Sequence, residues 1–291
     1  MGSCISAVDI YWFSGTGNTL LVAREMSSAF AEAGVDVALS RMETTDPAAV
    51  RPDRTIGIAC PVACQGTYPL VWSFVEGLPP VDGAGAFLVD TLAGRSGGIV
   101  GPMRRIVERK GYTPLGAREI IMPSNLFCRK PKDARTRRSA GEVAQDAMMP
   151  SDALCKPVED ERDVRKRQEG LAAARRFAAD LMAGTADWAP WSVSQGMLRW
   201  TSTCAPTRWL LHRMIRLRAD EGACTRCGLC ARLCPVGNIT VDDAPPVFAD
   251  KCQACMRCFS FCPTGAIRIG KRDLGRYRAV EAADLLGGAE T

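Results

Sequence analysis

The chain has 291 residues, 47% of them hydrophobic, and a formal net charge of +5. This size and hydrophobic content predict two domains, one with a sizeable core and one small. Because His212 is the single histidine, we expect neither a histidine-based metal site nor histidine-assisted nucleophilic catalysis. No recognised nucleic-acid module accompanies the basic residues, so we expect no nucleic-acid partner. No apolar run reaches the roughly 20 residues of a membrane span and no secretory signal is visible, so we expect a cytoplasmic protein.

The first predicted strand is an apolar run from Val8 to Phe13, and a helical pattern follows residue 19. The loop between them lacks the lysine of a P-loop, and Leu20 stands where a dinucleotide fingerprint places its third glycine, so neither motif fits. Backbone N–H groups at a helix N-terminus, together with hydroxyls, bind phosphate without a cationic side chain. The loop consists of Ser14, Gly15, Thr16, Gly17, Asn18 and Thr19. It resembles the FMN phosphate loop of flavodoxins.

Further strands are predicted over residues 35–39, 55–59 and 86–90. In an open parallel sheet, ligands bind at the carboxyl ends of the strands near the topological switch point, where the last two of these strands end in loops. By similarity to flavodoxins, the two loops flank the isoalloxazine ring of FMN. The expected contacts are Pro61, Val62, Ala63, Cys64, Gln65 and Gly66 in one loop and Thr91, Leu92, Ala93, Gly94, Gly97 and Gly98 in the other. Cys60 and Cys64 are candidates for a redox pair or a nucleophile, although we favour a small buried hydrophobe for each.

A fifth strand over residues 118–122 and a helix over 164–182 complete the first domain. The predicted fold class is α/β, a flavodoxin-like doubly wound sheet of five parallel strands in the order 2-1-3-4-5. Residues 123–163 are poorly periodic and rich in basic residues, and we interpret them as an insertion at the flavin edge. A lid and a docking surface are both compatible with this segment, and a solvated basic face is slightly favoured over a partner site.

The segment between the two domains is rich in tryptophan, with residues 188, 191, 200 and 209, and it holds a basic amphipathic stretch over 209–218. Pro206 is expected near the start of this helix. Three interpretations compete. Packing between the domains is favoured, because tryptophans in a connector usually bury area there. Membrane-surface binding, a peripheral contact, and partner docking are the alternatives.

Eight of the fourteen cysteines form two copies of C-x2-C-x2-C-x3-C-P, offset by 28 residues. The copies are Cys224, Cys227, Cys230 and Cys234, then Cys252, Cys255, Cys258 and Cys262. This spacing predicts two 4Fe–4S clusters, because a structural zinc site uses cysteine pairs held well apart in sequence. Such clusters and free thiols fit a reducing cytosol, typical of an anaerobe. The clusters are expected to supply much of the folding free energy of so small a unit.

The C-terminal repeat resembles a bacterial-type ferredoxin, and the whole chain resembles the flavodoxin–ferredoxin fusion family. In such ferredoxins the fourth cysteine of each run serves the other cluster. The resemblance therefore implies one cluster on Cys224, Cys227, Cys230 and Cys262 and another on Cys252, Cys255, Cys258 and Cys234. The expected domains are a flavodoxin-like FMN domain over 1–184, a connector over 185–221 and a two-cluster α+β ferredoxin domain over 222–291.

The function expected from these cofactors is electron transfer between a low-potential donor such as ferredoxin and a partner or small acceptor, through the flavin. Two alternatives stay open: a flavin reductase of a quinone or enoate type acceptor, and a redox or oxygen sensor. No substrate-side acid or base is visible, so whether the chain is an enzyme is undecided. The physiological partners, the direction of electron flow and the oligomeric state are likewise not determined by the sequence.

Overall fold

The computed structural model describes residues 5–125, 128–129, 161–270 and 274–287. Its main sheet has five parallel strands in the order β2-β1-β3-β4-β5, as predicted. The strands are β1 Ala7–Trp12, β2 Asp36–Arg41, β3 Thr55–Pro61, β4 Gly85–Leu92 and β5 Thr113–Ile121. The order reverses between β1 and β3, so the carboxyl ends of these two strands mark the switch point where ligands bind.

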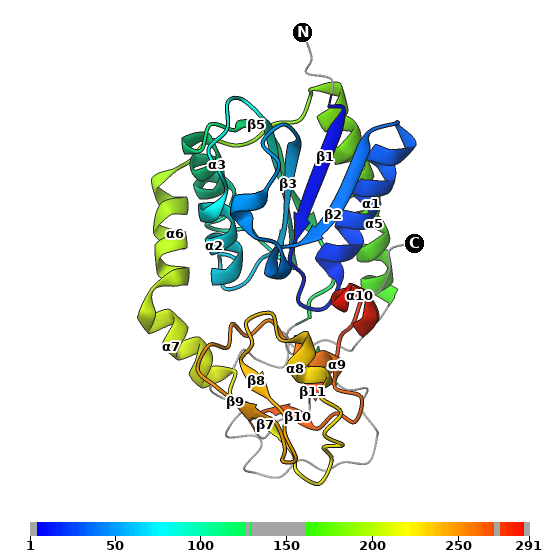
Figure 1. The fold of residues 1–291 in the computed structure, drawn as a ribbon, viewed down its shortest axis with the longest axis vertical. Helices are drawn as coiled ribbons and strands as arrows, with labels where there is room; N and C mark the ends of the chain where they lie inside the picture. The colour runs from blue at the N-terminus through cyan, green and yellow to red at the C-terminus, as the bar shows by residue number, and fades with distance from the viewer. Residues whose placement is uncertain (1–4, 126–127, 130–160, 271–273, 288–291) are drawn as a thin grey trace.

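Helices cover both faces of this sheet (Figure 1). On one face, α1 Asn18–Glu32 and α5 Glu161–Ala183 pack together, and Phe87 joins them through ring contacts with Phe30 and Phe177 at 5.9 and 6.2 Å. On the other face lie α2 Pro69–Gly77 and α3 Val100–Arg109. Short 3-10 turns η1 Met42–Thr44 and η2 Pro47–Ala49 follow β2. The apolar residues of β1, β3 and β4 are buried because helices cover them from both sides.

The cysteine repeat folds as one unit used twice. Helices α8 Leu229–Leu233 and α9 Arg257–Phe261 occupy equivalent positions. Left-handed backbone recurs at the same offset: Arg226 with Ala254, Gly228 with Met256, and Gly237 with Gly265. Strands β7 Leu217–Ala219 and β10 Ile267–Ile269 pair with each other, as do β8 Ile239–Thr240 and β9 Val247–Phe248. Positive φ at non-glycine residues is unusual, so the repeated dihedrals show that the sequence duplication is also a backbone duplication.

The C-terminal segment returns to the first domain, beside the N-terminus of α1 (Figure 1). Strand β11 Leu274–Gly275 pairs with β6 Cys128–Arg129 from the predicted insertion. Helix α10 Ala282–Leu286 follows and contacts α8. An ion pair joins Arg24 to Asp284 at 3.0 Å, and Arg41 donates to the carbonyl of Leu285 at 2.9 Å. The rest of the insertion, residues 130–160, lies outside the described residues.

The connector consists of α6 Val193–Thr203 and α7 Ala205–Met214, which run along the outer edge of the sheet domain towards the cysteine-rich domain (Figure 1). Pro206 lies in the first turn of α7. Packing between the domains, the favoured interpretation of the tryptophans, is wrong for Trp200 and Trp209, and Trp188 packs on α3 of the first domain instead. Trp188 is buried and donates to the carbonyl of Val100 at 2.9 Å, but Trp200 and Trp209 are 69% and 63% exposed. Of the helices in the described ranges, none is long and apolar enough to cross a membrane.

Candidate functional site

The loop between β1 and α1 forms a polar cradle at the switch point. Gly17 precedes α1 with φ +108°, and its N–H donates to the Ser14 hydroxyl at 3.0 Å. A Cβ at Gly17 would lie 2.6 Å from Val280, so a larger residue does not fit. Ser14, Thr16 and Thr19 are buried. Because the first turn of α1 contains no acidic residue, its N–H groups and these hydroxyls favour an anion such as a phosphate monoester.

The loop after β3 is a tight turn with strained backbone. Ala63 and Gly66 bond to each other through both backbone N–H groups, at 2.7 and 3.0 Å. The two central residues, Cys64 and Gln65, have φ +49° and +64°, where side chains are normally disfavoured by roughly 1–2 kcal/mol each. Such strain persists only when the surroundings hold it in place. It is one sign that this turn serves a site.

The three loops surround a cavity of about 340 Å³, a volume typical of small-ligand sites. Fourteen of the residues predicted from the sequence line it: Ser14, Gly15, Thr16, Asn18, Thr19, Pro61, Val62, Ala63, Cys64, Gln65, Thr91, Leu92, Ala93 and Gly94. The predicted residues Gly17, Gly66, Gly97 and Gly98 are outside this lining. Gly98 instead donates to the carbonyl of Gln65 at 2.7 Å and packs against α6, since the loop turns away from the cavity after Arg95.

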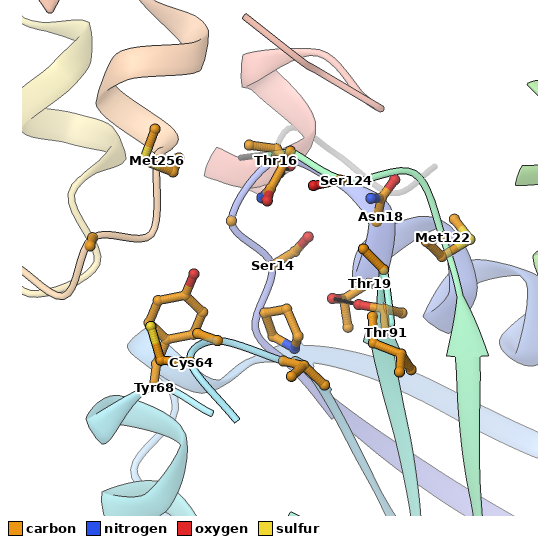
Figure 2. Close-up of a pocket in the computed structure, with 18 of the residues that line it drawn as sticks. Ser14, Thr16, Asn18, Thr19, Cys64, Tyr68, Thr91, Met122, Ser124 and Met256 are labelled. Atoms are coloured by element: carbon orange, nitrogen blue, oxygen red, sulfur yellow. Dashed lines mark hydrogen bonds between the residues drawn. The ribbon is translucent and has the colours of Figure 1, made fainter. Parts of the chain in front are cut away.

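The cavity is also lined by residues that sequence reasoning missed. Tyr68 directly precedes α2, and Met122, Pro123, Ser124 and Asn125 follow β5. Leu211 and Ile215 come from the connector, and Gln253, Ala254 and Met256 come from the second cysteine run. Figure 2 shows Cys64, Tyr68 and Met256 on one side of Ser14, and Thr19, Thr91 and Met122 on the other. The site therefore lies between the two domains rather than within the first.

Arg257 fixes the contact between the second cysteine run and the cradle. Its side chain is 2% exposed, and its Nε donates to the carbonyl of Ser14 at 2.8 Å. Its Nη1 lies 2.7 Å from a carboxylate oxygen of Glu43, itself 5% exposed, and its guanidinium covers the ring of Phe13 at 4.9 Å. A comparison of the two runs singles out Arg257, because the equivalent position of the first run holds Leu229. Only the second run carries this cation.

Backbone contacts join the same two segments. A Cβ at Gly15 would lie 2.5 Å from the carbonyl oxygen of Cys255, so only glycine fits where the cradle meets the cysteine run. The Gln253 side chain accepts from Leu70 N–H at 3.1 Å. From the C-terminal segment, Ala279 N–H donates to the carbonyl of Thr16 at 2.8 Å, and buried Tyr277 donates to the Asn18 side chain at 2.7 Å. The cradle is therefore held by the C-terminal domain on two sides.

Electrostatic interactions among the cysteine thiols indicate which of them lie together. Like-charge interaction with Cys234 contributes, after burial, to the raised pKa values of Cys252, Cys255 and Cys258. Burial likewise raises the pKa of Cys230, with smaller contributions from Cys227 and Cys262. The last cysteine of each run thus lies beside members of the other run. The crossed ligand sets that the ferredoxin resemblance implies stay a prediction.

The cysteines of the two runs differ in exposure. Cys255 and Cys258 are buried, whereas Cys227 is exposed. Burial raises the pKa of Cys255 to about 11 and that of Cys258 well above its ordinary value. Buried thiols are ionised at neutral pH only when a cation binds them, which iron does. Backbone N–H groups of Asn238 and Ala254 donate to Cys234 and Cys252 at 3.2 and 3.4 Å. Thiols are the donors that iron–sulfur clusters take, but no three or more Cys, His, Asp or Glu side chains in the described residues are already gathered closely enough to hold a metal ion.

A buried carboxyl group lies beneath the loops. Asp90, near the carboxyl end of β4, is fully buried, and the Ser96 hydroxyl donates to one of its oxygens. Burial raises the pKa of Asp90 to about 7, against the effect of that hydrogen bond, and the charge of Glu119 adds to the rise. Neighbouring Cys60 is also fully buried, and burial raises its pKa strongly. Cys60 is therefore not a nucleophile in this environment, which agrees with the small buried hydrophobe favoured from the sequence. The same prediction is wrong for Cys64, which is exposed.

Parts of this chain are similar to known proteins. Residues 214–267 match the family of 4Fe–4S dicluster domains. Among solved structures, the chain is similar to a flavodoxin of Megasphaera elsdenii, with 29% identity over 39% of this chain and 85% of that one and a TM-score of 0.36. It is also similar to flavodoxin 1 of Bacillus cereus, with 9% identity over 61% and 96% of the chains and a TM-score of 0.37. No curated protein sequence gives a match.

The sheet order and the cradle at its switch point define a flavodoxin-like domain. The family match defines a 4Fe–4S dicluster domain. The chain is thus a fusion of a flavodoxin-like domain and a two-cluster ferredoxin domain, and iron–sulfur electron transfer is its chemistry.

Proposed function

We propose that the protein is an FMN- and 4Fe–4S-dependent electron-transfer flavoprotein, in which the cavity between the domains holds FMN beside one of the two clusters. The observation that carries the proposal is the shared wall of the cavity. The same space is lined by the phosphate cradle and by Gln253, Ala254 and Met256 of the second cysteine run. A carrier that needed no contact between its cofactors would not require this close packing.

FMN fits the residues present. Ser14, Thr16 and Thr19, with the N–H groups that begin α1, supply donors for the phosphate. Thr19 and Thr91 are linked through their hydroxyls at 2.7 Å, and Asn125 donates to Thr16 at 3.0 Å, so the cradle is preorganised. The strained turn at residues 63–66 and the loop at 91–94 would hold the isoalloxazine ring. This role follows from their place in the cavity lining.

The proposed cluster ligands are the two crossed sets. The inner cluster is bound by Cys252, Cys255, Cys258 and Cys234, and the outer cluster by Cys224, Cys227, Cys230 and Cys262. The terms inner and outer are relative to the cavity. The carbonyl of Cys255 lies against Gly15 of the cradle, whereas Cys227 is exposed to solvent. In domain terms, we propose a flavodoxin-like domain over 1–184, a connector over 185–221 and a cluster domain over 222–291.

FMN would hold one or two electrons, whereas each cluster would pass one electron at a time. Together they would convert between one-electron and two-electron transfer. In this proposal electrons pass in sequence between the outer cluster, the inner cluster and FMN. Exposed Cys227 marks the place where an external redox protein, such as a reduced ferredoxin, exchanges electrons. The buried thiols of Cys255 and Cys258 exclude water from the middle of this path, and Arg257 keeps the cysteine run against Ser14.

Matched cysteine variants test this function. We expect Cys258→Ser, in the inner set, to abolish electron transfer between the clusters and the flavin, followed as flavin absorbance after flash photoreduction of the anaerobic protein. Cys224→Ser, in the outer set, should preserve fast transfer from the remaining cluster while slowing exchange with an added ferredoxin. Equal effects of the two variants on the internal step would contradict the proposed path. Purified protein that contains clusters but no flavin would contradict the function itself.

A further inference from the structure

The outer side of the connector carries an apolar stripe that faces solvent. On α6, Val193, Met197 and Trp200 are 65%, 64% and 69% exposed. Their spacing of four and three residues puts them on one face of the helix. The opposite face packs on the flavodoxin-like domain, where Ser202 meets Gly66 and Arg199 meets Gly98. The helix is therefore amphipathic, and its apolar side is turned outward.

The stripe continues onto α7. Trp209 and Leu210 are 63% and 50% exposed, and the Arg213 guanidinium covers the Trp209 ring at 5.6 Å. The other side of the same helix faces the cavity, which Leu211 and Ile215 line. Soluble monomers rarely expose bulky apolar side chains in one continuous patch, and such patches mark interaction sites.

The charged residues of the connector around the stripe are all basic. Residues 188–219 contain no aspartate or glutamate and five arginines. Arg213, Arg216 and Arg218 are exposed. The nearest acidic residues on the flanking helices are already paired: Glu76 with Arg199, and Glu108 with Arg104.

A shallow groove borders the stripe between α3 and α6. Its volume is about 240 Å³, and its lining includes Arg105, Arg109, Arg199 and Trp191. Arg105 covers the ring of Trp191 at 4.9 Å. Guanidinium groups bind phosphate with several donors at once, and the groove opens on the flank of α6 next to the exposed stripe. Apolar side chains, tryptophans and phosphate-binding groups thus share one surface.

We propose that one surface binds an anionic lipid bilayer: the exposed stripe of Val193, Met197, Trp200, Trp209 and Leu210, with the exposed arginines Arg105, Arg109, Arg213, Arg216 and Arg218. Tryptophan and aliphatic side chains enter the boundary between headgroups and acyl chains, while basic side chains meet lipid phosphates. Attraction to an anionic leaflet is favourable for each arginine near it. A protein partner would be expected to find several polar groups for hydrogen bonding among the apolar contacts, and the side chains at 193, 197 and 200 offer a single N–H donor, that of the Trp200 indole. This inference does not depend on the proposed electron-transfer path.

The test is flotation of the full-length holoprotein with vesicles, under anaerobic conditions. Vesicles of phosphatidylcholine alone are compared with vesicles that contain phosphatidylglycerol as well. We expect binding to the second kind, with affinity that falls as salt is added because the arginine contribution is screened. A blue shift of tryptophan emission should accompany binding, since Trp200 and Trp209 leave water.

Two pairs of variants separate the surface from general effects. Val193→Ser removes an apolar contact from the stripe, and Val247→Ser is its control, because Val247 is 64% exposed on β9 in the other domain. Arg105→Gln removes a cation from the groove, and its control is Arg165→Gln, exposed on α5. Loss of one arginine should weaken binding about five-fold, and Val193→Ser should weaken it several-fold. The controls should leave the affinity unchanged.

Three results would overturn the proposal. The first is the absence of binding to either kind of vesicle. The second is binding that Val193→Ser and Arg105→Gln weaken no more than their controls do. The third is self-association by analytical ultracentrifugation that Val193→Ser abolishes, without vesicle binding, which would make the surface an interface between copies of this chain.

Discussion

Replacing Arg257 by methionine tests whether a buried ion pair holds the two domains together. Arg257 and Glu43 are 2% and 5% exposed and lie 2.7 Å apart. Removal of one partner leaves the other charge buried without compensation, which typically costs about 3–5 kcal/mol. Arg257→Met also removes the hydrogen bond to the Ser14 carbonyl. We therefore expect the free energy of unfolding to fall by at least about 3 kcal/mol.

The assay is urea unfolding of the anaerobic holoprotein, followed by tryptophan fluorescence and by cluster absorbance. The double variant Arg257→Met with Glu43→Leu removes both charges, and apolar replacement of a buried pair is often neutral. Most of the lost stability should therefore return in the double variant. Arg175→Met is the control, because its ion pair with Glu25 is solvent-exposed and such pairs contribute little. A loss below about 1 kcal/mol in Arg257→Met, or a double variant no more stable than the single one, would refute the reasoning.

Further predictions concern Asp90 and Gly15. The folded state holds the Asp90 proton more tightly than the unfolded state, so this group reduces stability as pH rises from its ordinary pKa towards about 7. Asp90→Asn should therefore stabilise the protein, and thermal unfolding should show the gain increasing by about 1 kcal/mol between pH 6 and 8.5; a gain independent of pH would contradict the raised pKa. Gly15→Ala pushes a Cβ against the Cys255 carbonyl, an overpacking that costs roughly 1–3 kcal/mol, so FMN should be released on gel filtration. Gly222→Ala, where the nearest atom is 3.6 Å away, is its control, and equal flavin retention in both would count against the close contact.

The sequence was sufficient for the architecture of each domain. Apolar runs predicted all five parallel strands, three of them ending in loops rich in glycine or hydroxyl groups, because helices bury both faces and such strands read as nearly continuous hydrophobic segments. Strand and helix ends moved by a few residues: β5 begins at Thr113 rather than Arg118. The cysteine spacing carried the two-cluster prediction, because cluster ligands are set by local geometry.

The contact between the domains was not predicted, because it depends on pairs far apart in the chain. Nothing local indicates that Arg257 meets Glu43 or that the Cys255 carbonyl meets Gly15. The prediction that the tryptophans of the connector pack between the domains failed for a related reason. Burial preferences are averages over residue types, and they do not reveal which side of α6 a tryptophan occupies. Trp188 is buried, as the average for tryptophan predicts, whereas Trp200 is exposed.

The most direct test of the account is the cofactor content of the anaerobically purified protein, because the cavity between the domains is proposed to hold FMN beside the inner cluster. We predict about one FMN and about eight iron atoms per chain, the iron content of two 4Fe–4S clusters, and a Gly15→Ala variant that keeps its iron but loses its flavin. Iron without flavin in the unmodified protein would contradict the account.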